Sequence, residues 1–542
     1  SKEAKEAARK ALAKLPKGRE AREKKAAEEL AKNYDGRFSR MAKIEPLEPS
    51  ESFFNALASV FDPHTRYLAP AEKDNFDIQM SGSLEGIGAV LSEDDHYIRV
   101  QEIVPGGASF RQGKLKAGDL ILAVAQDGEE PVDVADMRIN QVVQMIRGPK
   151  GTVVTLTVKK PDDSIEIIAI TRDVVQIEAA YARGAVIDGP DGGKLGYVSL
   201  ASFYGNTRAR PGRTPQRNSS DDLRRLFLEM EKRKVPGVIL DLRGNGGGLL
   251  DHARQIAGLF IPTGPVVQTR YPKEDSQVLS DDDPAVVYTG QVVVLVNRFS
   301  ASASEIVAGA LQDYQRAVVV GTGPTHGKGT VQMIFDLNRL RGAPGLPLGV
   351  LKLTIQQFYR INGESTQFRG VVPDVLLPDP VGHLESRERD LDNAIPWDKV
   401  DPLQYSTWSG KSWKLPELTA RSKTRVAGNQ LFKKIMERSA YLDGRRKQTK
   451  VPLQRDKWLA RRKADREALE KADPKLDEAP AVLKPQVINY TGKLKKVDRE
   501  RIKAWKKSVS RDPWLNEARN ILADMLGQST SVTNTGSGPA GQ

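Results

Sequence analysis

The spacing of apolar residues changes along the chain, and the change separates regions with different predicted structure. Between residues 173 and 400, short apolar runs such as G-V-I-L-D-L, Q-V-V-V-L-V-N and A-V-V-V-G predict buried strands. Segments with apolar residues three and four positions apart, such as D-D-L-R-R-L-F-L-E-M-E-K, predict helices between them. Strands that alternate with helices indicate α/β organisation for this region.

Residues 78–172 have a different pattern, in which β-rich segments surround one helix. The strand Y-I-R-V-Q-E-I-V, the segment K-A-G-D-L-I-L-A-V and the helix V-A-D-M-R-I-N-Q-V-V-Q-M-I resemble a PDZ domain. Such a domain adds an extended peptide to a sheet edge and holds its terminal carboxylate with backbone N–H groups. Glycine lets a loop turn its amides inward, so Gly86, Ile87 and Gly88 are the predicted carboxylate loop. An ordinary hairpin turn is the alternative.

The two ends of the chain are rich in charged residues and helix formers. Residues 1–47 predict a charged helical segment, and residues 48–77 predict a helical lead-in to the PDZ domain. Residues 401–527 predict a charged helical C-terminal domain. Residues 528–542 are of low complexity and predict a disordered tail. The α/β region of residues 173–400 therefore lies between the PDZ-like region and the helical C-terminal domain.

The net charge of +13 is concentrated in those two ends. Residues 421–542 contain 29 basic and 14 acidic side chains, and residues 1–46 contain 14 and 8. The remaining residues 47–420 have a net charge of −8. Acidic residues are interspersed among the basic ones, which favours a solvated helical face over nucleic-acid binding. We therefore expect no nucleic-acid partner.

The composition limits the class of protein further. A chain of 542 residues is long enough for about three or four domains. No stretch approaches the roughly 18 consecutive apolar residues of a membrane-spanning helix, so we expect no transmembrane segment. Cysteine is absent, which is compatible with an oxidising compartment. The chain has no H-E-x-x-H or paired-histidine spacing, and we expect neither a metal site nor a cofactor.

Two short motifs could supply a nucleophile and its base. Ser302 lies in S-A-S-A-S-E at 300–305, and Lys328 lies in T-H-G-K-G-T. A serine hydroxyl is a weak nucleophile until a base takes its proton, and lysine can be that base only when burial lowers its pKa. Ser302 precedes an apolar-periodic segment, so it begins a predicted helix whose N-terminus favours developing negative charge. A simple small-residue helix cap is the alternative.

Several ordered motifs resemble the carboxyl-terminal processing peptidases, and among them the bacterial tail-specific proteases. The three main blocks are D-L-R-G-N-G-G-G at 241–248, S-A-S-A-S-E-I-V-A-G-A-L-Q-D-Y at 300–314 and P-T-H-G-K-G-T-V-Q at 324–332. Further similarity, such as F-D-P-H-T-R-Y at 61–67, extends over about residues 52–400. The resemblance implies a serine protease with a Ser–Lys dyad, and it makes residues 173–400 the protease core, with a crotonase- or Clp-like α/β fold. It also implies the periplasm, with a signal peptide removed before this chain begins.

The resemblance assigns roles to residues around the dyad. It makes Ser302 the nucleophile and Lys328 the general base, and Gln332 would orient the lysine amine, as a third group does in catalytic triads. The tetrahedral intermediate needs two donors aimed at its oxyanion. The backbone N–H of Ala303 and that of either Gly247 or Gly248 are the candidates.

Three further residues match family positions near this site. Glu305 and Thr325 would support the two catalytic loops. A carboxylate beside Lys328 would stabilise its ammonium form and weaken it as a base, so we expect Asp313 to have a structural role. The chain departs from the family pattern G-E-P-T-x-G-K-G, because G-T-G-P-T-H-G-K-G is one residue longer and lacks the glutamate. The role of His326 in this longer loop is left open.

The sequence thus predicts a serine endopeptidase that degrades or processes proteins selected by their apolar free C-termini. Its partners would be unfolded or tail-exposed protein substrates, and an adaptor protein stays open. A non-catalytic PDZ scaffold is the alternative, although both Ser302 and Lys328 are intact. A nucleotide-binding loop is less well supported. Thr322 stands where the first glycine of a phosphate loop belongs, and Gly329 replaces the hydroxyl residue that binds magnesium.

Overall fold

The chain forms two compact units that are interleaved along the sequence. The computed structural model describes residues 16, 18–42, 48–94, 96–205, 217–340, 347–410, 413–488 and 496–533. One unit combines residues 1–53 with 83–176, and the other combines residues 54–82 with 177–542. The start of the predicted segment 1–47 and the end of the predicted tail 528–542 lie outside the described residues. The structure is of mixed α and β type, as the sequence predicts.

The first unit contains the predicted PDZ region, built on a six-stranded antiparallel sheet. The strand order is β3-β4-β5-β7-β8, with β6 paired to β5, while β2 and β9 form a separate pair. Alternate residues such as Val154, Leu156 and Val158 are fully buried, because one face of the sheet covers the core. The elements are α2 (Arg19–Ala42), β2 (Ser83–Gly86), β3 (Ala89–Asp94), β4 (Tyr97–Ile103), α5 (Ala108–Gln112), β5 (Leu120–Gln126), β6 (Val132–Asp133), α6 (Ile139–Ile146), β7 (Val153–Lys159), β8 (Ile165–Thr171) and β9 (Asp173–Gln176), and α3 (Glu48–Ala58) contains the boundary with the second unit.

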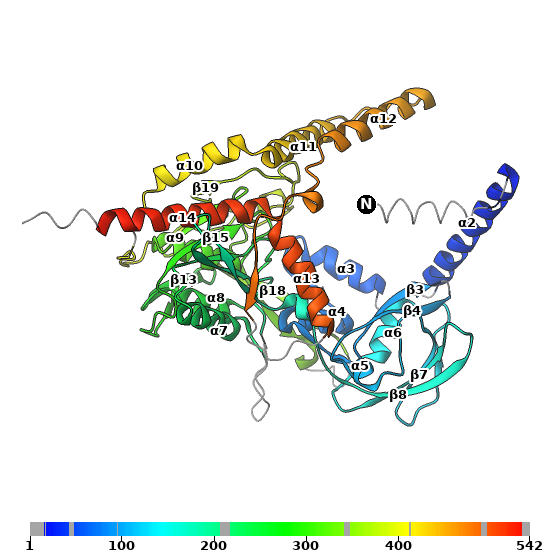
Figure 1. The fold of residues 1–542 in the computed structure, drawn as a ribbon. Coiled ribbons are helices and arrows are strands. Elements are labelled where there is room, and N and C mark those ends of the chain that lie inside the picture. The colour runs from blue at the N-terminus through cyan, green and yellow to red at the C-terminus, as the bar shows by residue number, and fades with distance from the viewer. Residues whose placement is uncertain are drawn as a thin grey trace, which may run out of the picture. The chain divides into compact units, whose positions relative to one another are not determined.

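The second unit is organised around a seven-stranded sheet of order β19-β16-β15-β12-β11-β10-β20. The five strands from β19 to β11 run parallel, and β10 is antiparallel to both β11 and β20. Figure 1 shows helices on both sides of this sheet. The elements are β10 (Arg183–Asp188), β11 (Lys194–Ser199), α7 (Ser219–Lys232), β12 (Gly237–Asp241), α8 (Leu250–Gly258), β15 (Gln291–Val296), α9 (Ala303–Asp313), β16 (Ala317–Gly321), β19 (Val375–Leu376) and β20 (Gln486–Ile488).

Burial on both faces explains why the central strands are apolar at every position. Val238 and Leu240 of β12 pack in one core cluster with side chains of α7, α8 and α9. Ile239, between them, packs in the other cluster with Leu522 and other residues of α14 (Pro513–Thr533). Fully burying such a side chain contributes about 1.5–3 kcal/mol. The C-terminal helix α14 is thus part of the core of this unit. It also extends past residue 528, into the segment predicted to be disordered, because adding residues to an existing helix costs little free energy.

A second, five-stranded antiparallel sheet completes the unit. Strand β18 (Val350–Tyr359) is its centre and pairs with β1 (Arg66–Leu68), β13 (Gly264–Arg270) and β17 (Thr330–Asp336), while β14 (Gln277–Asp281) pairs with β13. Strand β1 comes from residues 54–82, which precede the PDZ region in the sequence. The remaining helices are α4 (Pro70–Ser81), α10 (Leu415–Gly428), α11 (Gln430–Arg446), α12 (Arg455–Lys471) and α13 (Lys496–Ser510), with 3-10 turns η1 (Glu178–Ala180), η2 (Leu337–Arg339), η3 (Glu388–Asp390) and η4 (Leu476–Glu478). None of the helices in the described ranges is both long and apolar enough to cross a membrane.

Candidate functional site

The three main sequence motifs follow the carboxyl ends of three adjacent parallel strands. The glycine-rich segment follows β12, the Ser302 loop follows β15, and the Lys328 loop follows β16. Loops at the carboxyl ends of neighbouring parallel strands meet at one edge of the sheet, where α/β proteins bind their ligands. The loops are bonded to one another, since Ala301 N–H donates to Asn245 O at 3.0 Å and His326 N–H donates to Ser300 O at 2.9 Å.

Ser302 has an uncommon backbone conformation at the start of α9. Its φ of 56° and ψ of −113° place it in a region that residues other than glycine rarely adopt. The turn leads the loop that follows β15 into α9, and it leaves Ser302 partly exposed between buried Ala301 and Ala303. A strained, partly exposed serine at a helix N-terminus is typical of a nucleophile.

Glu305 connects the Ser302 loop with the Lys328 loop. Its Oε2 accepts hydrogen bonds from the backbone N–H of Ser302 at 2.7 Å and from that of Lys328 at 3.0 Å. Its Oε1 accepts from Gly327 N–H at 2.7 Å and from the hydroxyl of Thr325 at 2.6 Å. Four donors therefore converge on one fully buried carboxylate. Burial raises the pKa of Glu305 to about 7, although these hydrogen bonds oppose the shift.

The amine of Lys328 is held beside Gln332. Its Nζ donates to Gln332 Oε1 at 2.5 Å. No hydrogen bond joins this Nζ to Ser302 Oγ in the described structure. The two residues are linked instead through Glu305, which accepts a hydrogen bond from the backbone N–H of each. Burial, together with the nearby positive charge of Lys352, lowers the pKa of Lys328 to about 8. A lysine with this pKa is partly neutral near physiological pH and can accept a proton.

Of the predicted oxyanion residues, Ala303 follows Ser302 directly and Gly247 packs against it, whereas Gly248 packs against Phe203. A Cβ added to Gly247 would be 2.9 Å from Ser302 Cβ and 3.2 Å from Ala303 N, so the Gly247 backbone touches the start of α9. The N–H of Gly247 already donates to Asn245 Oδ1 at 2.9 Å. Within the described part of the chain, the N–H groups of Ala303 and Gly248 have no acceptor.

Asp313 is not among the groups around Lys328. It lies at the last position of α9, where its carboxylate pairs with Arg360 at 2.6 Å and accepts from Asn362 Nδ2 at 3.1 Å. Burial raises its pKa while the charge of Arg360 opposes the shift. This geometry favours the structural role that we expect for Asp313. That role stays a prediction.

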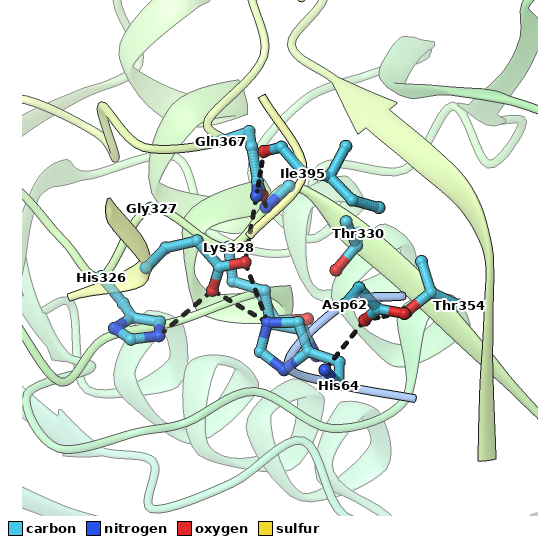
Figure 2. A network of polar contacts seen from close by, with 12 residues as sticks. Asp62, His64, His326, Gly327, Lys328, Thr330, Thr354, Gln367 and Ile395 are labelled. Carbon is cyan, nitrogen blue, oxygen red and sulfur yellow. Dashed lines mark hydrogen bonds and ion pairs between the residues drawn. The ribbon is translucent and has the colours of Figure 1, made fainter. Parts of the chain in front are cut away.

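A buried polar network beside Lys328 was not predicted from the sequence. Glu388 is fully buried, and its carboxylate contacts His64 Nε2 at 2.8 Å and accepts from Gln367 Nε2 at 3.0 Å. His326 approaches the same carboxylate, with Nε2 at 3.5 Å. Burial raises the pKa of Glu388, but hydrogen bonds from His326, His64 and Gln367 outweigh it and bring the pKa to about 2. Figure 2 shows His64 and His326 on either side of this network.

The network also contains Asp62, from a motif to which the sequence assigned no chemistry. The Oδ1 of Asp62 accepts from the hydroxyl of Thr354 at 2.8 Å. Asp62 belongs to F-D-P-H-T-R-Y, so the resemblance marked the segment. Nothing in that motif indicated that its partner is on β18. Among the described residues, no group of three or more His, Asp or Glu side chains is arranged to hold a metal ion.

The predicted carboxylate loop lies in the first unit, where Gly86 is the last residue of β2 and Ile87 and Gly88 connect β2 to β3. The carbonyl of Ile87 accepts from Ser109 N–H and that of Gly88 from Val104 N–H, both at 2.8 Å. The N–H groups of Ile87 and Gly88 have no acceptor within the described residues. Gly88 has φ of +77°, which glycine adopts without strain. The side chain of Ile87 is buried in the core of the unit, so the loop could offer its amides rather than this side chain to a ligand.

Profiles of known protein families match segments of both units. The profile of peptidase family S41 matches residues 194–377, and that of the PDZ domain matches residues 75–159. The profile of the tail-specific protease N-terminal domain matches residues 2–71, and that of the tail-specific protease C-terminal domain matches residues 381–527. These four matches cover both predicted ends of the chain as well as the core.

Three relatives are similar over most of this chain. A tail-specific protease of Haemophilus influenzae is 38% identical over 69% of the chain and 52% of its own length. A carboxy-terminal-processing protease of Bartonella bacilliformis is 31% identical over 61% of the chain and 70% of its own length. A carboxyl-terminal-processing protease of a Picosynechococcus species is 31% identical over 64% and 77%. The chain therefore spans about half the length of the first relative and more than two thirds of the other two.

Proposed function

The chain belongs to the carboxy-terminal-processing proteases of peptidase family S41, and on this premise we propose that it is a serine endopeptidase with Ser302 as nucleophile and Lys328 as general base. The observation that carries the proposal is the burial and hydrogen bonding of the Lys328 amine. Its amine is buried enough to have a pKa of about 8, and it is held by Gln332. A base with a pKa near the working pH is the most effective one.

The reaction follows from these groups. Neutral Lys328 takes the proton of the Ser302 hydroxyl while Oγ attacks the scissile carbonyl carbon, and the carbonyl oxygen becomes an oxyanion. When the C–N bond breaks, the ammonium of Lys328 gives its proton to the leaving amine. Water then attacks the acyl-enzyme, Lys328 accepts the water proton, and it returns that proton to Ser302 Oγ as the acid product leaves. Gln332 keeps the amine oriented through each transfer.

The oxyanion requires donors that are not already occupied. Of the candidate amides, those of Ala303 and Gly248 have no acceptor in the described structure. Gly247 N–H is held by Asn245. We therefore assign the oxyanion hole to Ala303 and Gly248, and give Gly247 the role of allowing close approach to Ser302. Removing one such donor typically lowers kcat about 10²–10³-fold.

The PDZ unit would select substrates by their free C-termini. Strand β3 is at one edge of its sheet, and α6 lies against it. An extended peptide could pair with β3 while the free amides of Ile87 and Gly88 bind its carboxylate. Unfolded or tail-exposed proteins with apolar ends would be the substrates. The periplasmic location and the need for an adaptor remain predictions from the family.

Two substitutions test the dyad. Ser302→Ala and Lys328→Ala should each remove nearly all cleavage of an unfolded protein substrate and leave the melting temperature close to that of the parent, because nucleophile and base act as one unit. Cleavage is measured by mass spectrometry of the products, with and without EDTA and with ATP removed. Activity that survives in either variant, or that requires a metal or ATP, would contradict the proposal.

A further inference from the structure

The orientation of the Gln332 side-chain amide decides whether its oxygen or its NH2 group faces the Nζ of Lys328. In the structure the amide oxygen faces Lys328 Nζ. The amide nitrogen faces the hydroxyls of Thr330 at 2.9 Å and Thr354 at 3.2 Å. Rotation of the amide by half a turn would place an NH2 group against the amine and leave Lys328 without its acceptor. Something must therefore hold Gln332 in one of two orientations of similar shape.

The proton of Thr354 provides that restraint. A threonine hydroxyl has one proton to donate and two lone pairs. Thr354 gives its proton to Asp62 Oδ1 at 2.8 Å, so toward Gln332 it can only accept. Only the amide nitrogen can satisfy it, and the amide oxygen must then point to Lys328. Thr330 has no such commitment and could donate or accept, so it does not select the orientation.

Asp62 can act in this way because it is itself held in place as an acceptor. It is buried, and it accepts from the backbone N–H of His64 at 2.8 Å and of Thr65 at 3.0 Å, and from the Thr65 hydroxyl at 2.5 Å. Burial favours its neutral form, but these hydrogen bonds outweigh burial and lower its pKa. The hydroxyl oxygen of Thr65 also accepts from Thr354 N–H at 3.1 Å, which ties this loop to β18. Figure 2 shows Asp62 and Thr354 facing each other.

We propose that Asp62 and Thr354 are positioning residues for the general base. Asp62 holds the proton of the Thr354 hydroxyl, that hydroxyl holds the Gln332 amide nitrogen, and the amide oxygen holds Lys328. The proposal rests on the assignment of Lys328 as the base. It gives a role in the reaction to the segment that precedes the PDZ region in the sequence, since that segment carries Asp62.

The charge of Asp62 adds a second, separable effect. The charged or titratable groups that act on Lys328 are the cation of Lys352 and the carboxylates of Glu388, Glu305 and Asp62, and His64 lies within electrostatic range as well. The negative charge of Asp62 raises the pKa of Lys328. Replacing Asp62 by Asn should therefore shift the pH–rate midpoint downward, whereas a residue that only supports the fold would lower stability and leave the midpoint unchanged.

The test compares hydroxyl and methyl at one position. The rate at which a small fluorophosphonate phosphonylates Ser302, with loss of fluoride, is measured against pH, beside kcat and KM for a peptide and the melting temperature. Thr354→Val keeps the shape but removes the acceptor, and kcat should fall about 10- to 100-fold with little change in KM. Thr354→Ser should restore most of the rate. Thr269→Val, at a buried threonine of β13 in the same sheet, is the control.

The outcomes separate this proposal from the function on which it rests. Asp62→Asn should lower the plateau and move the midpoint to lower pH, which gives a second reading if Thr354→Val fails to fold. Parental kcat in Thr354→Val, no rescue by Thr354→Ser, or an unmoved midpoint in Asp62→Asn would overturn the positioning role. If Ser302→Ala and Lys328→Ala also keep activity in the same assay, the dyad fails as well. If they are inactive, only the positioning role is lost.

Discussion

Lys328, the proposed general base, illustrates how desolvation can bring the pKa of a lysine toward neutrality. Desolvation and the charge of Lys352 lower its pKa, while the carboxylates of Glu388, Glu305 and Asp62 raise it. Burial prevails, and the pKa is about 8. The surrounding carboxylates keep the value from falling further, so the lysine changes charge near physiological pH. A base that titrates there gives a rate that rises with pH.

Glu305 should be more sensitive than an ordinary buried glutamate. It accepts two hydrogen bonds on each carboxylate oxygen, and it thereby joins the Ser302 and Lys328 loops. In Glu305→Gln, either amide orientation places an NH2 group against two donors. Each unsatisfied pair costs about 1–3 kcal/mol. We expect the rate of Ser302 labelling by the fluorophosphonate to fall about 10- to 100-fold, and thermal denaturation should show a lower melting temperature.

A matched glutamate separates loss of the loops from loss of charge. Glu517 is buried and pairs with Arg425 at 2.8 Å, and its hydrogen bonds in the described part of the chain go to Arg425 and Asn520 rather than to the Ser302 or Lys328 loop. Glu517→Gln should lower the melting temperature but leave the rate of Ser302 labelling in the folded protein unchanged. Equal effects of the two substitutions on the rate of Ser302 labelling would mean that Glu305 contributes stability alone.

At the scale of elements, proximity in sequence decided what could be predicted. The α/β alternation and the two catalytic loops could be read from short motifs, because each loop directly follows its strand. Asp62 could not be assigned a partner, since Thr354 lies 292 positions further on. Strand β20 has three residues and no clear pattern, and its pairing with β10 depends on the fold of the whole unit. The place of α14 in the core could not be predicted either, because the strands on which it packs, β12 and β15, are far from it in the sequence.

The glycine-rich loop should tolerate a side chain at one position and not at the next. Gly247 has φ of +106°, and a Cβ there would be 2.9 Å from Ser302 Cβ. Gly246 has ordinary φ, and a Cβ there would meet nothing within 4 Å. Gly247→Ala should therefore displace the nucleophile and lower kcat about 100-fold or more, whereas Gly246→Ala should be close to the parent. Comparable kcat for the two variants would argue against close packing of this loop on Ser302.

At the scale of the whole molecule, the order of segments along the chain is informative. The second unit is built from residues on both sides of the PDZ region, and the side that precedes it supplies Asp62 and β1. Residues 83–176, which contain the PDZ region, thus separate two parts of the second unit in the sequence. The basic residues are concentrated at the ends of the chain, and residues 47–420 are net negative at −8. This charge should disfavour acidic substrates.

Substrate choice should follow the chemistry of the C-terminus. We expect a substrate that ends in apolar residues to be cleaved much faster than the same substrate when it is amidated or ends in aspartates. Amidation removes the charge and one acceptor oxygen that the amides of Ile87 and Gly88 would bind. Initial cleavage rates for the three tails provide the measurement. Equal rates would show that the PDZ unit does not select substrates.

Substitution in the carboxylate loop gives the complementary test. Gly88 has φ of +77°, and a Cβ there would be 3.0 Å from Gly107 Cα. Gly113 has the same φ but open space around it. Gly88→Ala should reduce the preference for the free apolar tail, while Gly113→Ala should retain it. Both variants should keep the parental rate of Ser302 labelling by the fluorophosphonate, because that small reagent has no peptide C-terminus to be bound.

The central claim is that Ser302 is activated by a neutral Lys328, and the most direct test is the pH dependence of Ser302 labelling. The fluorophosphonate adduct is located by mass spectrometry, and its rate of formation is measured from about pH 5 to pH 10. Lys328 must lose its proton to act, so the label should fall on Ser302 and its rate should rise with pH through a midpoint of about 8. A label on another residue, or a rate on Ser302 that does not change with pH, would contradict the Ser–Lys mechanism.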